Sequence, residues 1–388
     1  MIAARVAPAV VADAEAALTA AAARGDAVAF EGGGTERDFG YSLERADLLL
    51  ETTALDRIVE YSPADLVVEV EAGMTLEALQ RVLRPNRQRL ALDPPLGSRA
   101  TIGGLLATNA YGPRRTRYGT LRDLIVGISI IRADGVRVRG GGKVVKNVAG
   151  FDLPKILVGS LGSLGMIATA TLRLHPAPEA TRLMRIEVDP DGALRAVARE
   201  LVERRLEPAA VAAYPHRDGT AVFAAFEGFE AGAAEQADRF AALARDLGCA
   251  CREEDAAALA RHDEAARTNG DLRARISVPP SALDAIQAEA LRSLAGALER
   301  PAQAIYPTIG VAFVGGDAND RERAAAAVET ARAQAEALGG NLVVTSAPPE
   351  LQVDRYGTLP PSFGLMRELK MRFDPERRLN RGRFIGRL

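Results

Sequence analysis

The stretch Gly141–Leu174, GGKVVKNVAGFDLPKILVGSLGSLGMIATATLRL, decides the fold of this chain. It contains two glycine-rich turns around Lys146, Asn147 and Asp152, and it then runs into a β-branched strand. Glycine at this density is costly unless the backbone must approach another group closely or adopt a positive φ. The stretch therefore predicts a place where the backbone of glycine residues contacts a ligand directly.

Two further glycine-rich loops lie upstream, at Glu31–Thr35 (EGGGT) and at Thr101–Gly112 (TIGGLLATNAYG). Three such loops in one N-terminal half indicate a long, phosphate-bearing cofactor that is held at several points. Concave clusters of backbone N–H groups bind anions without any lysine. We therefore expect EGGGT to hold a diphosphate and Gly33→Val to remove the ligand by filling its space. A simple glycine hairpin corner is the alternative interpretation.

Two common nucleotide motifs are missing. A P-loop needs Ser or Thr after its Gly-Lys pair, but Gly142-Lys143 is followed by Val144. A Rossmann fingerprint has the spacing GxGxxG between a strand and a helix, whereas Gly159–Gly165 reads GSLGSLG and leads into a strand. ATP hydrolysis and NAD binding are therefore not indicated.

The bulk composition excludes other classes of protein. A length of 388 residues predicts two domains, and a net charge of −2 gives no support for nucleic-acid binding. Cys249 and Cys251, with three scattered histidines, cannot complete a zinc or iron–sulfur site, so we interpret both as packing residues. No apolar run approaches a membrane span, and 1–25 reads as an amphipathic helix rather than a signal peptide. We expect a cytoplasmic protein whose membrane association, if it has one, runs through partner subunits.

The pattern predicts an α+β chain with a first domain at 1–176. Its predicted helices and strands are helix Ala9–Arg24, strands Ala27–Glu31, Asp47–Glu51, Leu55–Glu60 and Leu66–Glu71, helix Leu76–Leu83 with Thr75 as N-cap, a hairpin of Leu124–Arg132 and Val136–Arg139, and strand Ile167–Leu174.

After His175-Pro176-Ala177-Pro178 the glycine loops become rare, and alanine-rich helical patterns begin. A second, ferredoxin-like α+β domain is predicted at 177–345, with helices on one face of its sheet. Its predicted helices are Gly192–Arg205, Ala231–Leu247, Ser281–Leu298 and Asn319–Leu338, and its strands are Leu183–Val188, Thr220–Phe226, Arg273–Val278, Ile305–Val314 and Asn341–Thr345. The spacing hints at an internal duplication. Residues 346–388 hold many turn residues and are expected to pack back on the first domain.

The ordered motifs carry a resemblance. EGGGT, then VEAG at Val70–Gly73, then TIGG…ATN…G…R.YG…RD, then KN.AG.DL and GSLG.LG.I resemble the FAD-binding (PCMH-type) domain of the vanillyl-alcohol oxidase family. Within it, VVKNVAGFDL at 144–153 is most similar to the E-subunit family of bacterial glycolate oxidase (glycolate dehydrogenase). The resemblance covers most of 1–176, weakens through 177–345, and returns at Phe373-Asp374-Pro375 and Leu379-Asn380.

The resemblance implies FAD as the cofactor, with EGGGT on its diphosphate, the second loop along the flavin and ribityl chain, and Asn380 near the isoalloxazine. No histidine lies in 34–37 and no cysteine in 92–99, the places where relatives attach flavin covalently, so the FAD is expected to be non-covalent. Arg381 stands where relatives usually have proline. The residues implied to line FAD are Gly32, Gly33, Gly34, Thr35, Thr101, Gly103, Gly104, Asn109, Gly112, Arg117, Gly119, Asn147, Gly150, Asp152, Ile167 and Asn380.

The same resemblance implies an FAD-binding subunit of a 2-hydroxy-acid (glycolate-type) dehydrogenase. It would pass electrons to a further acceptor within a complex that holds a catalytic flavin subunit and an iron–sulfur subunit. Two alternatives stay open: a self-sufficient FAD-dependent D-2-hydroxy-acid dehydrogenase, and a non-catalytic assembly subunit. The histidine-rich motif that catalytic relatives carry in the second domain is missing, and the comparable strand here reads IYPTIG at 305–310, which makes Tyr306 a candidate.

The remaining catalytic candidates come from residue chemistry. Arg273 and Arg275 alternate with apolar residues on one predicted strand, so both point to one face, where an arginine fork could bind a carboxylate. A salt-bridged sheet face is the alternative. Histidine is a natural base for a hydroxyl proton: His216 is placed where it can face a pocket, whereas His175 reads as a hinge residue and His262 as solvated.

Overall fold

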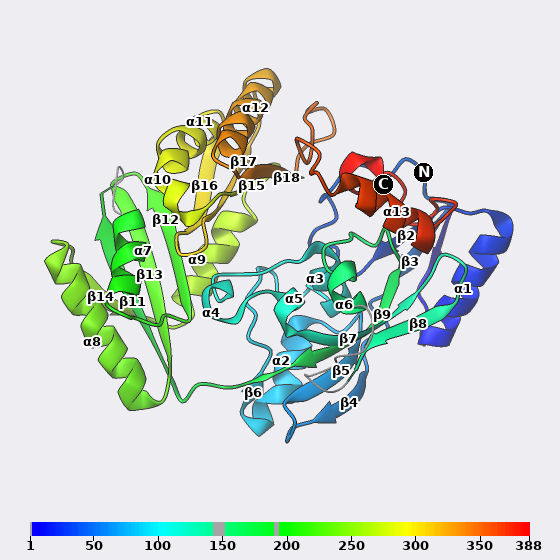
Figure 1. The fold of residues 1–388 in the computed structure, drawn as a ribbon, viewed down its shortest axis with the longest axis horizontal. Coiled ribbons are helices and arrows are strands. Elements are labelled where there is room, and N and C mark those ends of the chain that lie inside the picture. The colour runs from blue at the N-terminus through cyan, green and yellow to red at the C-terminus, as the bar shows by residue number, and fades with distance from the viewer. Residues whose placement is uncertain (1, 143–151, 190–193) are drawn as a thin grey trace.

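The computed structural model describes residues 2–142, 152–189 and 194–388. The chain forms two α+β parts, and the C-terminal segment returns to the first of them, where both termini lie close together (Figure 1). The α+β fold class predicted from the sequence is therefore confirmed.

A small parallel sheet begins the first part. Its strand order is β1 (Ala4–Val6), β3 (Leu48–Glu51) and β2 (Val28–Glu31), and α1 (Val11–Arg24) connects the first two strands in the chain. Asp13 in the first turn of α1 accepts hydrogen bonds from the backbone N–H groups of Ala9 and Val10, which directly precede the helix, and Gly25 ends the helix with a φ of 70°. The sheet places the loop after β2 at its carboxyl edge, which is where EGGGT lies.

A five-stranded antiparallel sheet makes the rest of the first part. Its order is β4 (Ile58–Ser62), β5 (Val67–Glu71), β9 (Met166–Arg173), β7 (Ile125–Ile131) and β8 (Arg137–Gly141). The strand that follows GSLG.LG is the central β9, and seven of its eight residues are buried, which agrees with its β-branched and alanine-rich sequence.

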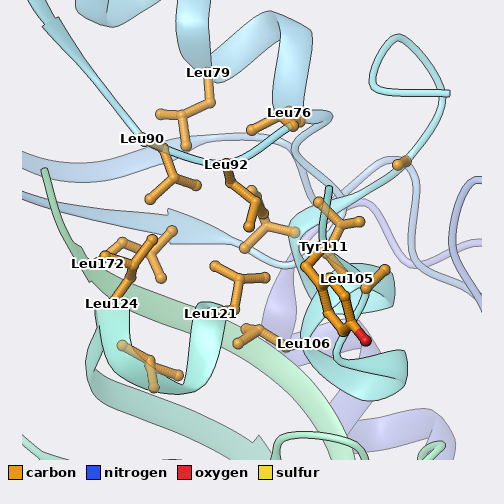
Figure 2. Packing of buried hydrophobic residues seen from close by; sticks show 14 of the residues in the cluster. Leu76, Leu79, Leu90, Leu92, Leu105, Leu106, Tyr111, Leu121, Leu124 and Leu172 are labelled. Atoms are coloured by element: carbon orange, nitrogen blue, oxygen red, sulfur yellow. The ribbon is translucent and has the colours of Figure 1, made fainter. Parts of the chain in front are cut away.

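Helix α2 (Leu76–Leu83) packs its leucines on this sheet. Thr75 accepts a hydrogen bond from the Ala78 backbone N–H at 3.2 Å, as the predicted N-cap should. Figure 2 shows the resulting layer, in which leucines of α2, of the segment around Leu90 and of α5 (Leu121–Leu124) meet β9. This core supports the second glycine loop, Thr101–Gly112.

Short elements complete the first part and the return segment. They are η1 (Arg84–Asn86), β6 (Gln88–Arg89), α3 (Ile102–Thr108), α4 (Arg115–Tyr118), α6 (Leu153–Leu157), β10 (His175–Pro176), α13 (Phe363–Phe373) and η4 (Ile385–Arg387).

The second part is built on one eight-stranded antiparallel sheet that divides into two similar halves. The first half is β11 (Ala180–Val188), α7 (Leu194–Glu203), β12 (Ala210–His216), β13 (Gly219–Gly228), α8 (Glu230–Asp246) and β14 (Cys251–Glu254). The second half is β15 (Leu272–Ser277), η2 (Pro280–Ala282), α10 (Leu283–Ile286), η3 (Gln287–Leu291), α11 (Arg292–Gly296), β16 (Glu299–Tyr306), β17 (Val311–Asp317), α12 (Arg321–Ala337) and β18 (Asn341–Ser346).

Each half has the strand order fourth, first, third, second, and the halves join where β12 pairs with β16. This is the order of a ferredoxin-like βαββαβ unit. The internal duplication at which the helix spacing hinted is therefore present in the topology, although the two sequences do not match well.

The large sheet is buried on both faces. Successive residues of β13 point to opposite faces of the sheet. Val222 and Ala224 face the long helices, whereas Ala221 and Phe223 face the first part of the chain. Helix α9 (Ala258–Arg267) lies on that second face, between the sheet and the first part (Figure 1). The prediction that all helices cover one face was therefore wrong, because α9 covers the other.

Two predicted elements differ from the structure. The expected strand Ile305–Val314 is a hairpin, since the chain turns at Gly310, which has a φ of 65° and whose Cβ would lie 2.0 Å from the Val278 carbonyl oxygen. The expected helix Ser281–Leu298 is divided into short α and π turns.

Strand β12 was not predicted, because its run AVAAYPH resembles neighbouring helical sequence. The expected helix start at Gly192 lies outside the described residues.

Candidate functional site

An elongated cavity of about 240 Å³ runs between the small parallel sheet and the central strand β9. We call it the glycine cavity. Backbone of the glycine loops forms one wall, and apolar side chains such as Phe30 and Leu49 form the other. Among its lining residues are the predicted Gly32, Gly33, Gly34, Thr35, Thr101, Gly103, Gly104, Ile167 and Asn380.

The glycines of this wall are required by close packing of one loop on the other. A Cβ on Gly32 would lie 2.3 Å from Thr101 Oγ1, and a Cβ on Gly33 would lie 1.7 Å from the Arg99 carbonyl oxygen. At Gly104 a Cβ would meet only Thr101 Oγ1, at 3.1 Å, so the rest of that space belongs to the cavity. The expected reason for Gly33 was therefore wrong: its missing side chain makes room for Arg99 rather than for a ligand.

We expect Gly33→Ala to lower the free energy of unfolding by about 1–3 kcal/mol, because the new Cβ overlaps backbone that cannot move aside. FAD affinity should fall with it, since EGGGT must shift. Gly232→Ala in α8 is the matched control: a Cβ there meets nothing within 4 Å, so helix propensity should leave stability unchanged or higher by about 0.5–1 kcal/mol. Urea titration of both variants measures this, and equal stability of the two would contradict the packing argument.

A second cavity of about 80 Å³ opens where the first part meets the large sheet. We call it the arginine chamber. It is lined by Arg273 and Arg275 of β15, by Arg267 of α9, and by Glu36 and Asn109 of the first part. Thr35, Glu36 and Thr108 line both this chamber and the glycine cavity, so the two cavities adjoin there.

Buried partners fix the Arg267 side chain, which is 7% exposed. It donates to the Tyr111 carbonyl oxygen, and it lies 3.4 Å from Asp263 Oδ2 and 4.0 Å from the ring centre of Phe313. Burial raises the pKa of Asp263, and the Arg267 charge opposes that rise. The guanidinium is therefore held in one place at the chamber wall.

Two tyrosine hydroxyl groups hold Asp263, the partner of Arg267, in place. The hydroxyl groups of Tyr306 and Tyr214 both donate to Asp263 Oδ1, and Tyr306 is fully buried. Burial raises the pKa of Tyr306. Tyr306, predicted as a catalytic candidate, thus supports Arg267 instead of lining the chamber.

Arg275 and Asn109 have unused hydrogen-bonding atoms at the chamber. Arg275 Nε and Asn109 Oδ1 are buried without a hydrogen-bond partner within the described residues. Arg273, by comparison, lies 3.5 Å from the Thr268 carbonyl oxygen and 4.0 Å from Asp38. Buried polar atoms are usually paired, so these two atoms are available to a polar group bound in the chamber.

Asn380 lines the glycine cavity, but its amide is already used. Its Oδ1 accepts from the Phe30 backbone N–H at 3.1 Å, and its Nδ2 donates to the Leu161 carbonyl oxygen. The residue therefore ties the return segment to the cavity wall.

Several predicted cofactor residues lie away from both cavities. Gly112 packs its backbone on Asp93, and Gly119 is a turn glycine beside Asp123. Arg117 faces a separate surface cavity near Tyr118, and the Asp152 carboxylate is paired with Lys155 at 2.8 Å. Asn147 and Gly150 lie outside the described residues.

The histidines also lie outside the two cavities. His216 is paired with Glu187 at 2.9 Å on an exposed strand end, and it lines neither of the two cavities. His262 is exposed but lies against the rings of Tyr214 and Phe223. His175 meets Tyr118 edge-on where the first part ends.

Sequence reasoning missed Glu36 and Arg267. Glu36 directly follows EGGGT, so its position next to a predicted ligand loop was a usable signal. Arg267 gave no such signal, because its helix reads as an ordinary charged surface helix. Of its neighbours in space, Asp263 is on the same helix, whereas Tyr111 and Phe313 come from two distant segments.

Two further structural findings concern metals and membranes. Within 2–142, 152–189 and 194–388, no group of three or more His, Cys, Asp or Glu side chains could hold a metal ion. In the same ranges, no helix has the length and apolarity to cross a bilayer. Both thiols, Cys249 and Cys251, are free and pack beside the long helices.

Comparison with known proteins finds relatives of the first part. Residues 2–141 match the family described as FAD binding domain. The chain is 38% identical to glycolate oxidase subunit GlcE of Escherichia coli over 152 residues, which are 39% of this chain and 42% of that protein. It is 32% identical to D-2-hydroxyglutarate dehydrogenase of Xanthomonas citri over 177 residues (46% and 38%), and 31% identical to glycolate oxidase subunit GlcD of Bacillus subtilis over 179 residues (46% and 38%).

The matched stretches span about two fifths of the length of those relatives. Among solved structures, an alkyldihydroxyacetonephosphate synthase superposes with a TM-score of 0.72 at 15% identity, over 97% of this chain and 76% of that one, which shows a shared fold. The glycine cavity has the features that FAD needs, namely a backbone wall for a diphosphate and apolar surface for the rings. Residues 2–141 therefore form an FAD-binding domain, and the cofactor of this domain is FAD.

Proposed function

We propose that the chain is an FAD-linked 2-hydroxy-acid dehydrogenase subunit of the glycolate type. FAD binds non-covalently in the glycine cavity, and the hydroxy acid binds in the arginine chamber. Electrons then pass to an acceptor within a complex that includes a catalytic flavin subunit and an iron–sulfur subunit. The named relatives, glycolate oxidase subunits and a hydroxy-acid dehydrogenase, support this class of reaction.

One observation carries the proposal: a cavity suited to FAD adjoins a chamber lined by three arginines. A carboxylate is the group that guanidinium ions bind best. Within the described residues, Arg275 has a buried Nε without a partner, whereas Arg267 is paired with Asp263 and Arg273 lies near Asp38. No histidine or cysteine is among the described residues that line the two cavities, and this supports the proposal of non-covalent attachment.

The chain's own residues bind and orient the acid in this proposal. Arg275 pairs with the substrate carboxylate, and Arg267, fixed by Asp263, sets the far wall. When bound, FAD supplies a two-electron acceptor. The large sheet and α9 cover the chamber and limit its contact with water, which strengthens these charge interactions.

Anaerobic titration of the purified protein tests the proposed function. Denaturation with acid should release yellow FAD into solution, and glycolate or D-lactate should bleach the flavin of the native protein. If the hydroxy acid alone bleaches the flavin, the chain is a self-sufficient dehydrogenase. If the hydroxy acid bleaches the flavin only after the partner flavoprotein is added, the chain is a dependent subunit. A flavin that neither acid reduces under either condition would overturn the proposal.

Arg275→Met should raise the KM for the hydroxy acid about 10- to 100-fold and change kcat less, because the carboxylate loses its charged partner. Arg300→Met is the matched control, since Arg300 is an 83% exposed arginine paired with Asp317 on another surface. Steady-state flavin reduction measures both variants. A KM unchanged in Arg275→Met would contradict the assignment of the carboxylate site.

A further inference from the structure

Glu36 lies at the place where the two cavities meet. It lines the glycine cavity and the arginine chamber at once, directly after the EGGGT loop. Its carboxylate makes no hydrogen bond or salt bridge within the part of the chain that the structure describes, although its backbone oxygen bonds to Phe39 N. Glu36 is half-buried, and a carboxylate that is partly removed from water without a fixed partner is costly to keep, so its position calls for a function.

Four charged groups act on this carboxyl. Burial raises the pKa of Glu36, and the charges of Arg267, Arg273 and Arg275 oppose that rise, whereas Asp38 adds to it. The arginines come from the second part of the chain, Arg267 from α9 and the other two from β15. Their charges keep the ionised form accessible, while burial keeps it a stronger base than an exposed carboxylate.

No other residue of the chamber offers a comparable base. Glu36 is the only carboxyl or imidazole group among the described residues that line it. His216 and His262, the histidines of the second part, lie elsewhere. Asp263 is turned to Arg267 and two phenols, so its oxygens are occupied.

We propose that Glu36 is the catalytic base that accepts the hydroxyl proton of the 2-hydroxy acid. This rests on the proposed function. The substrate O–H bond breaks and its proton goes to Glu36, the C2–H bond breaks with loss of a hydride, and a C2=O bond forms. The acid loses two electrons and becomes a 2-keto acid; FAD, which the residues of the glycine cavity would hold, would supply the acceptor for the hydride and its two electrons.

The first test is the pH profile of anaerobic flavin reduction by glycolate and D-lactate. In the wild type, kcat/KM should rise with pH through the pKa of Glu36, because only the carboxylate accepts a proton. Glu36→Gln should lower kcat at least about 100-fold and remove this acid limb. Glu36→Asp should keep an acid limb at a lower rate, since a shorter carboxylate remains.

Asp38→Asn is the matched control. It removes a neighbouring carboxylate that raises the pKa of Glu36, so its acid limb should move to lower pH while the rate at high pH is kept. A Glu36→Gln variant with the wild-type rate and pH profile would overturn the proposal. So would an Asp38→Asn variant that shifts the limb to higher pH.

A second measurement does not depend on turnover. Oxalate, a dianion that cannot be oxidised in this way, should bind the arginine chamber and favour the protonated form of Glu36. Calorimetry in two buffers of different ionisation enthalpy should then show proton uptake on binding to the wild type. Glu36→Gln should bind oxalate without that uptake, and uptake that persists in the variant would contradict the assignment.

The outcomes separate the two proposals. If the wild type binds FAD but no hydroxy acid reduces it, alone or with partner subunits, the proposed function fails. If the wild type is reduced and Glu36→Gln is reduced equally fast, only the role of Glu36 fails.

Discussion

Asp374→Ala should lower the free energy of unfolding by about 3–5 kcal/mol, because it leaves a buried ammonium without its carboxylate. Lys370 and Asp374 are 1% and 0% exposed, and Lys370 Nζ lies 2.7 Å from Asp374 Oδ2. Burial lowers the pKa of Lys370, and the Asp374 charge is what opposes this. The remaining partners of Lys370, the carbonyl oxygens of Ser163 and Leu379, carry no compensating charge.

The same substitution should weaken FAD binding. Asp374 also accepts from the Arg378 and Leu379 backbone N–H groups, and so it shapes the turn that precedes Asn380. That turn places Leu379 beside Val28 and Asn380 on the wall of the glycine cavity. Without Asp374 this wall loses its support, so the FAD dissociation constant should rise.

Urea unfolding and fluorimetric FAD titration measure the two effects of Asp374→Ala. Asp284→Ala is the matched control, because Asp284 forms an exposed ion pair with Arg195 at 3.0 Å, and exposed pairs contribute about 0–1 kcal/mol. If both variants lose equally little stability, the buried pair does not hold the return segment.

The N-terminal fold could be predicted from local sequence. Alternation of apolar residues located the strands around Val67–Glu71 and Met166–Arg173, and Thr75 marked the start of its helix correctly. These signals are local, because each strand and cap is set by residues within a few positions. The hairpin turn at Gly310 escaped prediction, because apolar residues continue on both sides of it and the turn depends on contact with Val278.

The candidate site was predictable on its cofactor side and less so on its substrate side. Glycine-rich loops are easily recognised in a sequence, and the FAD-binding domain that they indicated is confirmed for residues 2–141. Even there, a side chain on Gly33 would meet the Arg99 backbone rather than the ligand, a detail that only the packed loops reveal. The chamber brings Glu36 close to Arg267 and Arg275, which are more than 200 residues away in the sequence. No local sequence pattern predicts such a long-range contact.

Glu227→Gln should lower the free energy of unfolding at pH 7 by about 3 kcal/mol and loosen the junction of the two parts. Glu227 of β13 is 1% exposed, and it accepts hydrogen bonds from Arg89 and from Arg114 at 2.7 Å. Both arginines belong to the first part. Burial alone would raise the pKa of Glu227, but these arginines outweigh it and lower the pKa to about 2. The gap from the ordinary 4.5 corresponds to about 3 kcal/mol.

The sign of this effect fixes its pH window. A carboxyl whose pKa is lowered by folding stabilises the protein above its unfolded pKa, and this contribution is lost as pH falls through the folded pKa. The stability difference between wild type and Glu227→Gln should therefore be full above about pH 5 and shrink towards pH 2. Asp93, which also contacts Arg114, works the other way: burial raises its pKa to about 6, so its own ionisation costs stability as pH rises.

The informative quantity for Glu227→Gln is thus the difference between the two proteins at each pH, rather than the stability of either one alone. Urea midpoints at pH 7, 5, 4 and 3 supply it. Glu203→Gln, which removes an exposed partner of Arg199, should show a difference near zero throughout. A difference for Glu227→Gln that stays constant down to pH 3 would mean that its carboxylate is not what holds Arg89 and Arg114 at the junction, because a charge-dependent contribution must weaken as that charge is lost.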